Sequence, residues 1–234
     1  QKAKTLIKEA TQYYNGKIQY LAGVDEAGRG PLAGPVVAAA VILPLGCDLE
    51  TIRDSKKLSE KKRNLIFSEI VDVAVSIGIG IVHEKEIDKM NILQGTYKAM
   101  KMALGKLKHY PEKVLIDGLK GDIKHYNCNY IVDGDNKSQS IAAASIIAKV
   151  TRDRIMLEYD KIYPEYGFAK HKGYGTKFHL EIIMKNKATS IHRKSFNPIK
   201  LHIPKLSFFN TTEKLINLSQ QLAATGIVKK GYKI

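Results

Sequence analysis

Three short apolar segments, each rich in branched residues, run directly into acidic side chains, and this repeated pattern constrains the fold more than any other feature. The segments end in Val24-Asp25-Glu26, Ile116-Asp117-Gly118 and Val132-Asp133-Gly134-Asp135. Segments of this length and composition are typical of buried strands, and strand ends in an open α/β sheet meet at a common crevice. The pattern therefore predicts a sheet that gathers carboxylates from distant parts of the chain.

The rest of the hydrophobic pattern predicts helices packed on that sheet. Strands are expected at 18–24, 36–43, 75–81, 114–116 and 130–132, and helices at 59–73, 91–108, 140–163, 176–186 and 212–222. A hairpin followed by strands that alternate with helices indicates a mixed sheet and an α/β fold class. We expect one domain over residues 1–195, with a peripheral helix at 1–16, and a helical extension over 196–234.

The chain carries far more positive than negative charge. Its 234 residues include 38 Lys and Arg against 23 Asp and Glu, which gives a formal net charge of +15. A surplus of this size favours a polyanionic partner such as nucleic acid, although surface lysines also improve solubility. The hydrophobic content of 44% excludes a disordered chain.

The number of cysteines and the hydropathy of the chain indicate the cellular compartment. The two cysteines, Cys47 and Cys128, are too few for a disulfide framework and lack the spacing of a zinc site. No apolar run is long enough for a transmembrane helix, and the first residues do not resemble a signal peptide. These features predict a cytoplasmic protein, and the lack of a long heptad pattern predicts a monomer.

Each acid, taken alone, also fits a turn, because Asp-Gly is a favoured turn pair. Three acidic strand ends together favour a metal site, since carboxylates clustered at a half-buried edge repel one another unless a cation neutralises them. Oxygen ligands without cysteine favour Mg²⁺ or Mn²⁺ over zinc. Two such ions would suit the attack of water on a phosphodiester. An acidic centre in a strongly basic chain thus points to a nuclease.

A glycine-rich loop follows the first acidic pair, and two phosphate-binding motifs fail on it. A P-loop would need Lys after Gly28, where the chain has Arg29. The dinucleotide fingerprint would need a glycine one position before Gly34. The loop therefore indicates close backbone approach, either to a ribose or phosphate or within a tight hairpin connection.

Two lysine-rich segments are candidate phosphate contacts. The first contains Lys56 and Lys57 at the start of a helix, where a solvated helix face is the alternative. The second contains Lys172 and Tyr174, and the tyrosine lies between two glycines. An aromatic ring in such a cationic loop can stack on a sugar or base, while the alternative is a tyrosine that packs within a turn.

At Asp25-Glu26-Ala27-Gly28-Arg29-Gly30 the chain closely resembles ribonuclease HII, the bacterial type 2 ribonuclease H. Further segments look like that family's in the same order, namely DSKKL at 54–58, Asp117-Gly118, AASIIAKVTRD at 143–153, HKGYGT at 171–176 and HRKSF at 192–196. The resemblance covers roughly residues 18–198. It implies a ribonuclease H-like fold, with a mixed five-stranded sheet flanked by helices and a helical C-terminal region.

The resemblance also implies four acids that bind metal and act in catalysis: Asp25, Glu26, Asp117 and Asp135. Asp133 repeats the Asp-Gly pattern of Asp117. The family's fourth acid, however, lies ten residues before the serine that corresponds to Ser145, and this spacing selects Asp135. The implied cofactor is a pair of Mg²⁺ or Mn²⁺ ions.

Members of that family hydrolyse the RNA strand of RNA/DNA hybrids and incise duplex DNA on the 5′ side of embedded ribonucleotides, leaving a 3′-hydroxyl and a 5′-phosphate. The implied substrate contacts are Gly28, Arg29 and Gly30 at the 2′-hydroxyl, Tyr174 on the following deoxyribose, and Lys56, Lys57 and Lys172 at phosphates. Two alternatives stay open: a nucleic-acid-binding module without catalytic activity, and a DNA nuclease on the same fold.

Overall fold

The computed structural model describes residues 18–47, 49, 52, 59–118, 121 and 123–233. The predicted peripheral helix at 1–16 and the predicted phosphate contacts Lys56 and Lys57 lie outside the described residues. Within those residues, no helix combines the length and apolarity that crossing a membrane requires.

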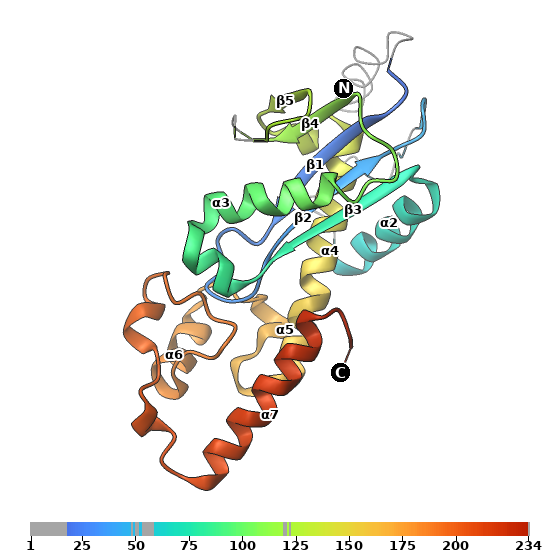
Figure 1. Ribbon diagram of the computed structural model, residues 1–234. Helices are drawn as coiled ribbons and strands as arrows, with labels where there is room; N and C mark the ends of the chain where they lie inside the picture. Colours follow the sequence, from blue (N-terminus) through green and yellow to red (C-terminus); the bar gives the residue numbers. More distant parts are fainter. Residues whose placement is uncertain are drawn as a thin grey trace. The chain divides into compact units, whose positions relative to one another are not determined.

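Five strands form one mixed sheet, shown in Figure 1, with the order β3-β2-β1-β4-β5. The strands are β1 (Leu21–Ala27), β2 (Val36–Ile42), β3 (Ser76–Val82), β4 (Lys113–Asp117) and β5 (Cys128–Ile131). The pairs β1–β2 and β2–β3 are antiparallel, whereas β4 runs parallel to β1 and β5 parallel to β4. This arrangement confirms the predicted mixed five-stranded sheet.

Helices cover both faces of the sheet (Figure 1). On one face, α2 (Glu60–Val73) and the first part of α4 (Gln139–Ile162) share an apolar cluster with Ile77 and Ile79 of β3. On the other face lies α3 (Glu84–Leu104), so close that a Cβ on Gly80 would be 1.9 Å from the carbonyl oxygen of Ala99. The alternation of isoleucine and glycine along β3 therefore follows from the two faces of a strand.

Several element boundaries differ from the prediction, and three of the differences are the most informative. The helix expected from residue 91 begins at Glu84, because α3 consists of two helices joined at a kink where Asn91 has φ 70°. The segment before that kink spans too few turns to show a helical period. Strand β1 continues through Asp25 and Glu26, since its pairing with β2 extends to Ala27. The last helix, α7 (Thr212–Lys229), continues past residue 222.

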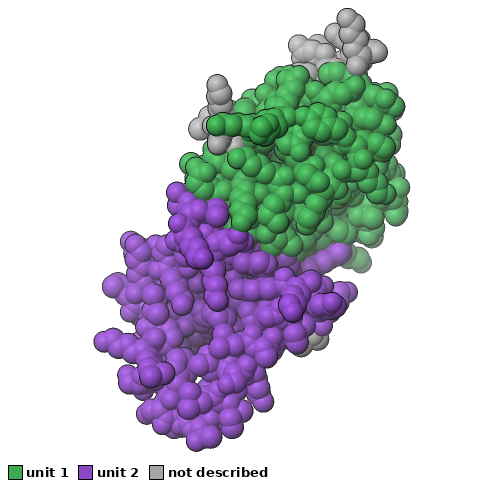
Figure 2. Space-filling view, in the orientation of Figure 1, with its two compact units in different colours: residues 1–27, 36–82, 93–151 green, residues 28–35, 83–92, 152–234 purple. Residues whose placement is uncertain are grey.

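The chain divides into two compact units, coloured separately in Figure 2. Unit 1 consists of residues 1–27, 36–82 and 93–151, and unit 2 of residues 28–35, 83–92 and 152–234. Unit 1 contains the sheet. Unit 2 contains η3 (Pro164–Tyr166), α5 (Phe168–His171), α6 (Lys177–Asn186), η4 (Ile199–His202), η5 (Leu206–Phe208) and α7. The boundary proposed between residues 195 and 196 stays a prediction.

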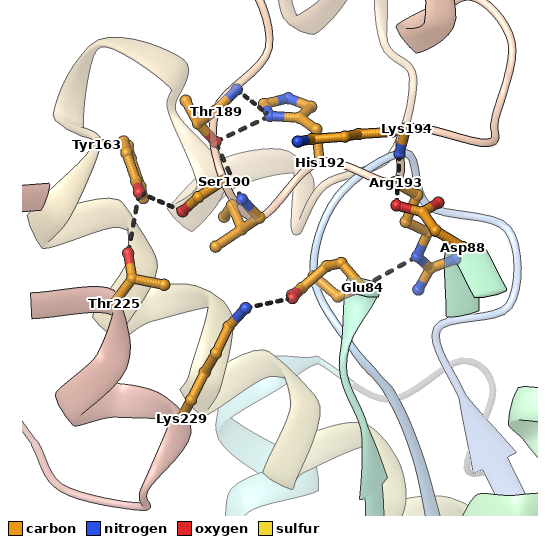
Figure 3. Close-up of polar contacts among 12 residues, drawn as sticks. Glu84, Asp88, Tyr163, Thr189, Ser190, His192, Arg193, Lys194, Thr225 and Lys229 are labelled. Atoms are coloured by element: carbon orange, nitrogen blue, oxygen red, sulfur yellow. Dashed lines mark hydrogen bonds and ion pairs between the residues drawn. The ribbon is translucent and has the colours of Figure 1, made fainter. Parts of the chain in front are cut away.

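Aromatic rings and buried polar contacts form the interior of unit 2. Tyr166 and Phe168 stack with ring centroids 5.5 Å apart. The hydroxyl of Tyr163 forms hydrogen bonds of 2.9 Å with Thr225 of α7 and with Ser190 (Figure 3). A further contact, 2.7 Å long, joins Lys229 of α7 to the buried carboxylate of Glu84 (Figure 3). These contacts hold α7 within unit 2.

Candidate functional site

The parallel pairing of β1 and β4 brings two predicted acids together in unit 1. Val24 and Ile116 are register partners, so Asp25 and Asp117 follow at neighbouring positions on adjacent strands. Glu26 is next to Asp25 in β1. Carboxylates that are far apart in the sequence therefore lie at one edge of the sheet.

Asp25 lies at the centre of this group and is 6% exposed. It accepts a 2.7 Å hydrogen bond from the backbone N–H of Glu26 and a further one from the hydroxyl of Ser145 on α4. Burial raises the pKa of Asp25 well above its usual value, and the charges of Glu26 and Asp117 raise it further. A carboxylate in such a setting is stabilised as an anion by a nearby cation.

The contact from Ser145 was missed by the sequence analysis, which used this residue only to locate the fourth acid. The interaction depends on close packing between α4 and β1. A Cβ on Gly23 would lie 2.0 Å from the carbonyl carbon of Ser140, so α4 rests directly on the backbone of β1. The alanine-rich start of the helix gives a hint of this close approach but does not reveal which side chain meets Asp25.

The structure distinguishes the two candidates for the fourth acid. Asp135 lies in η2 (Gly134–Asn136) and is 4% exposed. Next to it, the backbone N–H of Gly134 donates to the carboxylate of Asp117 at 2.6 Å, which places this turn beside the end of β4. Asp133 is exposed and is joined to Asn136 at 2.7 Å. This placement favours Asp135 over Asp133.

The donor set of the four acids suits a hard divalent cation. It supplies carboxylate oxygens, and the repulsion around buried Asp25 is of the kind that Mg²⁺ or Mn²⁺ relieves. Among the described residues, no three His, Cys, Asp or Glu side chains form a ready-made metal cage. Mg²⁺ is usually held by one or two carboxylates, with water and substrate phosphates completing its shell. The residues present therefore fit such an ion by their chemistry.

The predicted glycine loop, residues 28–30, belongs to unit 2 and is held by a buried arginine. Arg193 is fully buried and donates to the carbonyl oxygens of Gly28, Arg29 and Gly34 at 2.5, 2.8 and 3.0 Å. Gly28 has a φ of 95°, and a Cβ there would lie 2.1 Å from Nε of Arg152, so glycine alone fits. Residues 29 and 30 are exposed.

Tyr174 lies beside this loop, although the two are far apart in the sequence. The position of a Cβ on Gly30 is 3.6 Å from Cε1 of Tyr174. The tyrosine is 46% exposed, and the guanidinium carbon of Arg152 lies 6.0 Å from the centre of its ring. Leu32 joins the two segments through its N–H, which donates to the carbonyl of Gly173 at 2.8 Å. Unit 2 therefore unites two of the predicted substrate contacts.

The structure describes one of the three predicted phosphate contacts, Lys172. Lys172 is buried, and its ammonium donates to the carbonyl of Ala169 in the preceding helix α5. Lys56 and Lys57 lie outside the described residues. A role for these lysines at phosphates stays a prediction.

Comparison with known proteins gives a consistent result. The family model described as Ribonuclease HII matches residues 22–199. A ribonuclease HII of Acetivibrio thermocellus is 59% identical over 190 residues, which cover 81% of this chain and 74% of that protein. One of Clostridioides difficile is 55% identical over 183 residues, covering 78% and 72%. The crystal structure of ribonuclease H2 from Pyrococcus horikoshii OT3 is similar with a TM-score of 0.66 at 28% identity, covering 78% of this chain and 96% of that one.

Proposed function

The chain belongs to the ribonuclease HII family and is an endoribonuclease, and we propose that it cleaves RNA/DNA hybrids and ribonucleotides embedded in duplex DNA. In hybrids it would hydrolyse the RNA strand, and in duplex DNA it would incise on the 5′ side of the ribonucleotide. The products would carry a 3′-hydroxyl and a 5′-phosphate. The observation that carries this proposal is that Asp25 and Asp117 each directly follow the register pair Val24–Ile116 on adjacent parallel strands.

We propose that four carboxylates hold two divalent ions, Mg²⁺ or Mn²⁺, and they are Asp25, Glu26, Asp117 and Asp135. When bound, these ions supply activation of water and stabilisation of the charge that develops on the phosphate. The chain's own groups would hold the carboxylates in fixed positions. Asp25 is fixed by Ser145 and by the N–H of Glu26, and Asp117 by the N–H of Gly134. Groups held in this way need little rearrangement as the reaction proceeds.

Recognition of the ribonucleotide is assigned to unit 2. Residues 28–30 would meet the 2′-hydroxyl, because two glycines let a ribose approach a main chain that Arg193 holds in place. The exposed ring of Tyr174 beside Gly30 would stack on the deoxyribose that follows. Residues 28–30 would thus recognise RNA, and Tyr174 would recognise the change from RNA to DNA.

Two duplexes of identical sequence test the substrate assignment, one entirely DNA and the other with a single ribonucleotide. With Mg²⁺ or Mn²⁺ present, we expect incision of the second alone, on the 5′ side of the ribonucleotide. Equal cutting of both duplexes would support the DNA nuclease instead. Binding without cleavage at any metal concentration would support the module that lacks catalytic activity.

Removal of single carboxylates tests the assignment of the acids. Asp25→Asn or Asp117→Asn should lower the cleavage rate about a thousandfold or more, because each carries charge at the reacting phosphate. Binding of a hybrid should survive, since recognition lies in other residues. The matched control is Asp133→Asn at the exposed neighbouring acid, which should cleave like the wild type. A wild-type rate for Asp25→Asn with Mg²⁺ would refute the two-ion assignment.

Metal removal gives an independent check of the same assignment. A chelator should abolish cleavage, and an excess of Mg²⁺ or Mn²⁺ should restore it. Cleavage that persists in chelator would contradict the role proposed for the four acids.

A further inference from the structure

One dipeptide, His192 with Arg193, is linked to both segments assigned to ribonucleotide recognition, directly to residues 28–30 and through His179 to Tyr174. We propose that it is a positioning element that sets residues 28–30 and Tyr174 against each other. The inference rests on the proposed function, because it concerns how that recognition site is held. The HRKSF segment that contains the dipeptide had no role in the sequence analysis beyond its resemblance to the family.

The arginine acts on the glycine loop. Its guanidinium donates through three nitrogens to three carbonyl oxygens, two of them on Gly28 and Arg29. Burial, together with the charge of Arg152, lowers the pKa of Arg193 to about 9, so the group stays charged at neutral pH. Hydrogen bonds from a charged donor are stronger than neutral ones, and a planar fork reaches several acceptors that one ammonium cannot.

The histidine acts on Tyr174 through a second histidine. The N–H of Thr189 donates to Nδ1 of His192 at 2.9 Å (Figure 3), which leaves the ring proton of His192 on Nε2. That Nε2 lies 3.1 Å from Nε2 of His179, which must therefore accept. The proton of His179 is then on Nδ1, 2.9 Å from the carbonyl oxygen of Tyr174. The hydrogen bonds thus run in one direction and end on the tyrosine.

The direction of this chain requires neutral rings, and both rings lie in surroundings that keep them neutral. His179 and His192 are buried, with exposed fractions of 0% and 1%. Burial lowers the pKa of His179 to about 4, and burial together with the nearby histidines lowers the pKa of His192 well below its usual value. At neutral pH neither ring carries a charge.

Main-chain contacts tie the same dipeptide to the segment that follows the glycine loop. His192 forms an antiparallel bridge with Ala33, and the N–H of Arg193 donates to the carbonyl of Leu32 at 2.9 Å. Beyond the dipeptide, Asp88 accepts from the N–H of Lys194 at 3.0 Å (Figure 3). It also accepts from the N–H of Ser195 at 2.8 Å. The dipeptide is therefore fixed at both ends and cannot shift without moving the loop.

Two substitutions test the two parts of the dipeptide separately. The arginine arm is Arg193 with its contacts to residues 28–30, and the histidine arm is His192 with its link to Tyr174 through His179. Arg193→Lys keeps a positive charge but loses the fork, so the main chain at residues 28–30 would no longer be fixed. His192→Gln interrupts the chain of hydrogen bonds that ends on Tyr174, and His179→Gln serves as a second variant of that arm if the first does not fold. The matched control is Thr225→Val, which loses a buried hydrogen bond to Tyr163 in the same unit and touches neither recognition segment.

Binding tests the arginine arm without chemistry. In an Asp117→Asn background, fluorescence anisotropy would give the affinity for a duplex with one ribonucleotide and for the all-DNA duplex. We expect a preference for the ribonucleotide that Arg193→Lys reduces about tenfold, roughly the contribution of one well-made hydrogen bond. Thr225→Val in that background should leave the preference unchanged. A preference that survives Arg193→Lys would overturn the arginine's role.

Cleavage tests the histidine arm, with the full chain otherwise unchanged. The ratio of kcat/KM on a single-ribonucleotide duplex to kcat/KM on a long RNA/DNA hybrid should fall about tenfold or more in His192→Gln, because only the first substrate offers the deoxyribose that Tyr174 would contact. Thr225→Val should keep the wild-type ratio even if its thermal midpoint falls. An unchanged ratio in His192→Gln, or an equal change in Thr225→Val, would overturn the inference. If the wild type does not cut the single-ribonucleotide duplex, the proposed function itself fails.

Discussion

Among single residues, the buried histidines of unit 2 are points of acid sensitivity. His179 faces the imidazole of His192 at 3.1 Å and stacks on His171 with ring centroids 4.3 Å apart. A proton added to His179 would place a charge where burial and the neighbouring imidazole of His171 oppose it. It would also convert the acceptor at Nε2 into a donor that points at the donor of His192.

The folded state should therefore lose stability on acidification. The pKa of His179 is about 4 in the folded chain and about 6.5 in an unfolded one. Between these values the unfolded chain binds more protons, so this contribution is complete above about pH 6.5 and is lost as the pH falls toward 4. We expect His179→Gln to reduce the loss of unfolding free energy between pH 7 and pH 5 by about 2 kcal/mol, measured by urea unfolding.

His202 in η4 provides the control, since His202→Gln removes a histidine of the same unit outside this network. That variant should keep the acid sensitivity of the wild type. An equal loss of stability in His179→Gln and in the wild type would show that His179 is not its source.

Residues differ in whether their roles can be predicted from the sequence. Asp25 and Asp117 could be predicted because each directly follows an apolar segment, and that segment marks the acid as part of a strand. The role of Arg193 could not, because its partners are backbone carbonyls, which every residue possesses. Asp135 was chosen over Asp133 from the spacing of the family that the chain resembles, because the repeated Asp-Gly pattern does not encode the difference in burial between them.

At the scale of elements, the contact between β1 and α4 is the closest approach that supports the acidic site. It rests on Gly23, where a Cβ would come within 2.0 Å of the backbone of Ser140. The same helix carries Ser145, which donates to Asp25. Packing between these two elements therefore sets both the stability of unit 1 and the position of one site residue.

Gly23→Ala should force α4 away from β1 and lower the free energy of unfolding by about 1–3 kcal/mol, as overpacked cores do. The matched control is Gly226→Ala in the exposed interior of α7, where an added Cβ meets nothing within 4 Å. That variant should gain about 0.5–1 kcal/mol, because glycine is a poor helix former. Urea unfolding of both variants gives the comparison, and a Gly23→Ala protein as stable as the wild type would contradict the close packing.

The hydrophobic pattern predicts some elements well and misses irregularities within others. The alternation along β3 predicted a strand correctly, because isoleucine faces one layer and glycine admits α3 on the other. The kink at Asn91 was not predicted, since neither glycine nor proline marks it in the sequence. A single residue with a positive φ has no periodic signature in the sequence.

For the whole molecule, the proposed function gives separate tasks to the net charge of +15 and to the acidic site. The excess of Lys and Arg would attract the phosphates of any duplex, and counterion release makes such binding weaken as salt rises. Contacts of this kind position a nucleic acid without reading its sugar. Affinity and selectivity should therefore respond differently to salt.

Titrations of the Asp117→Asn protein from about 50 to 200 mM salt test this separation. Plots of log Kd against log salt for the ribonucleotide duplex and for the all-DNA duplex should both be straight and parallel, with a slope of about 0.9 for each phosphate neutralised. Lines that converge at high salt would show that the basic surplus also carries selectivity.

The contacts of Arg193 join residues that the ribosome adds to the chain at very different times. Its acceptors on Arg29 and Gly28 precede it by 164 and 165 residues. At a synthesis rate of about 5–20 residues per second, roughly 10–30 seconds separate the appearance of the loop from the appearance of its arginine. A growing polypeptide thus contains Asp25 and Glu26 well before the arginine that fixes residues 28–30 has been added. The discrimination between ribose and deoxyribose that we propose would therefore arise later in synthesis than the four acids.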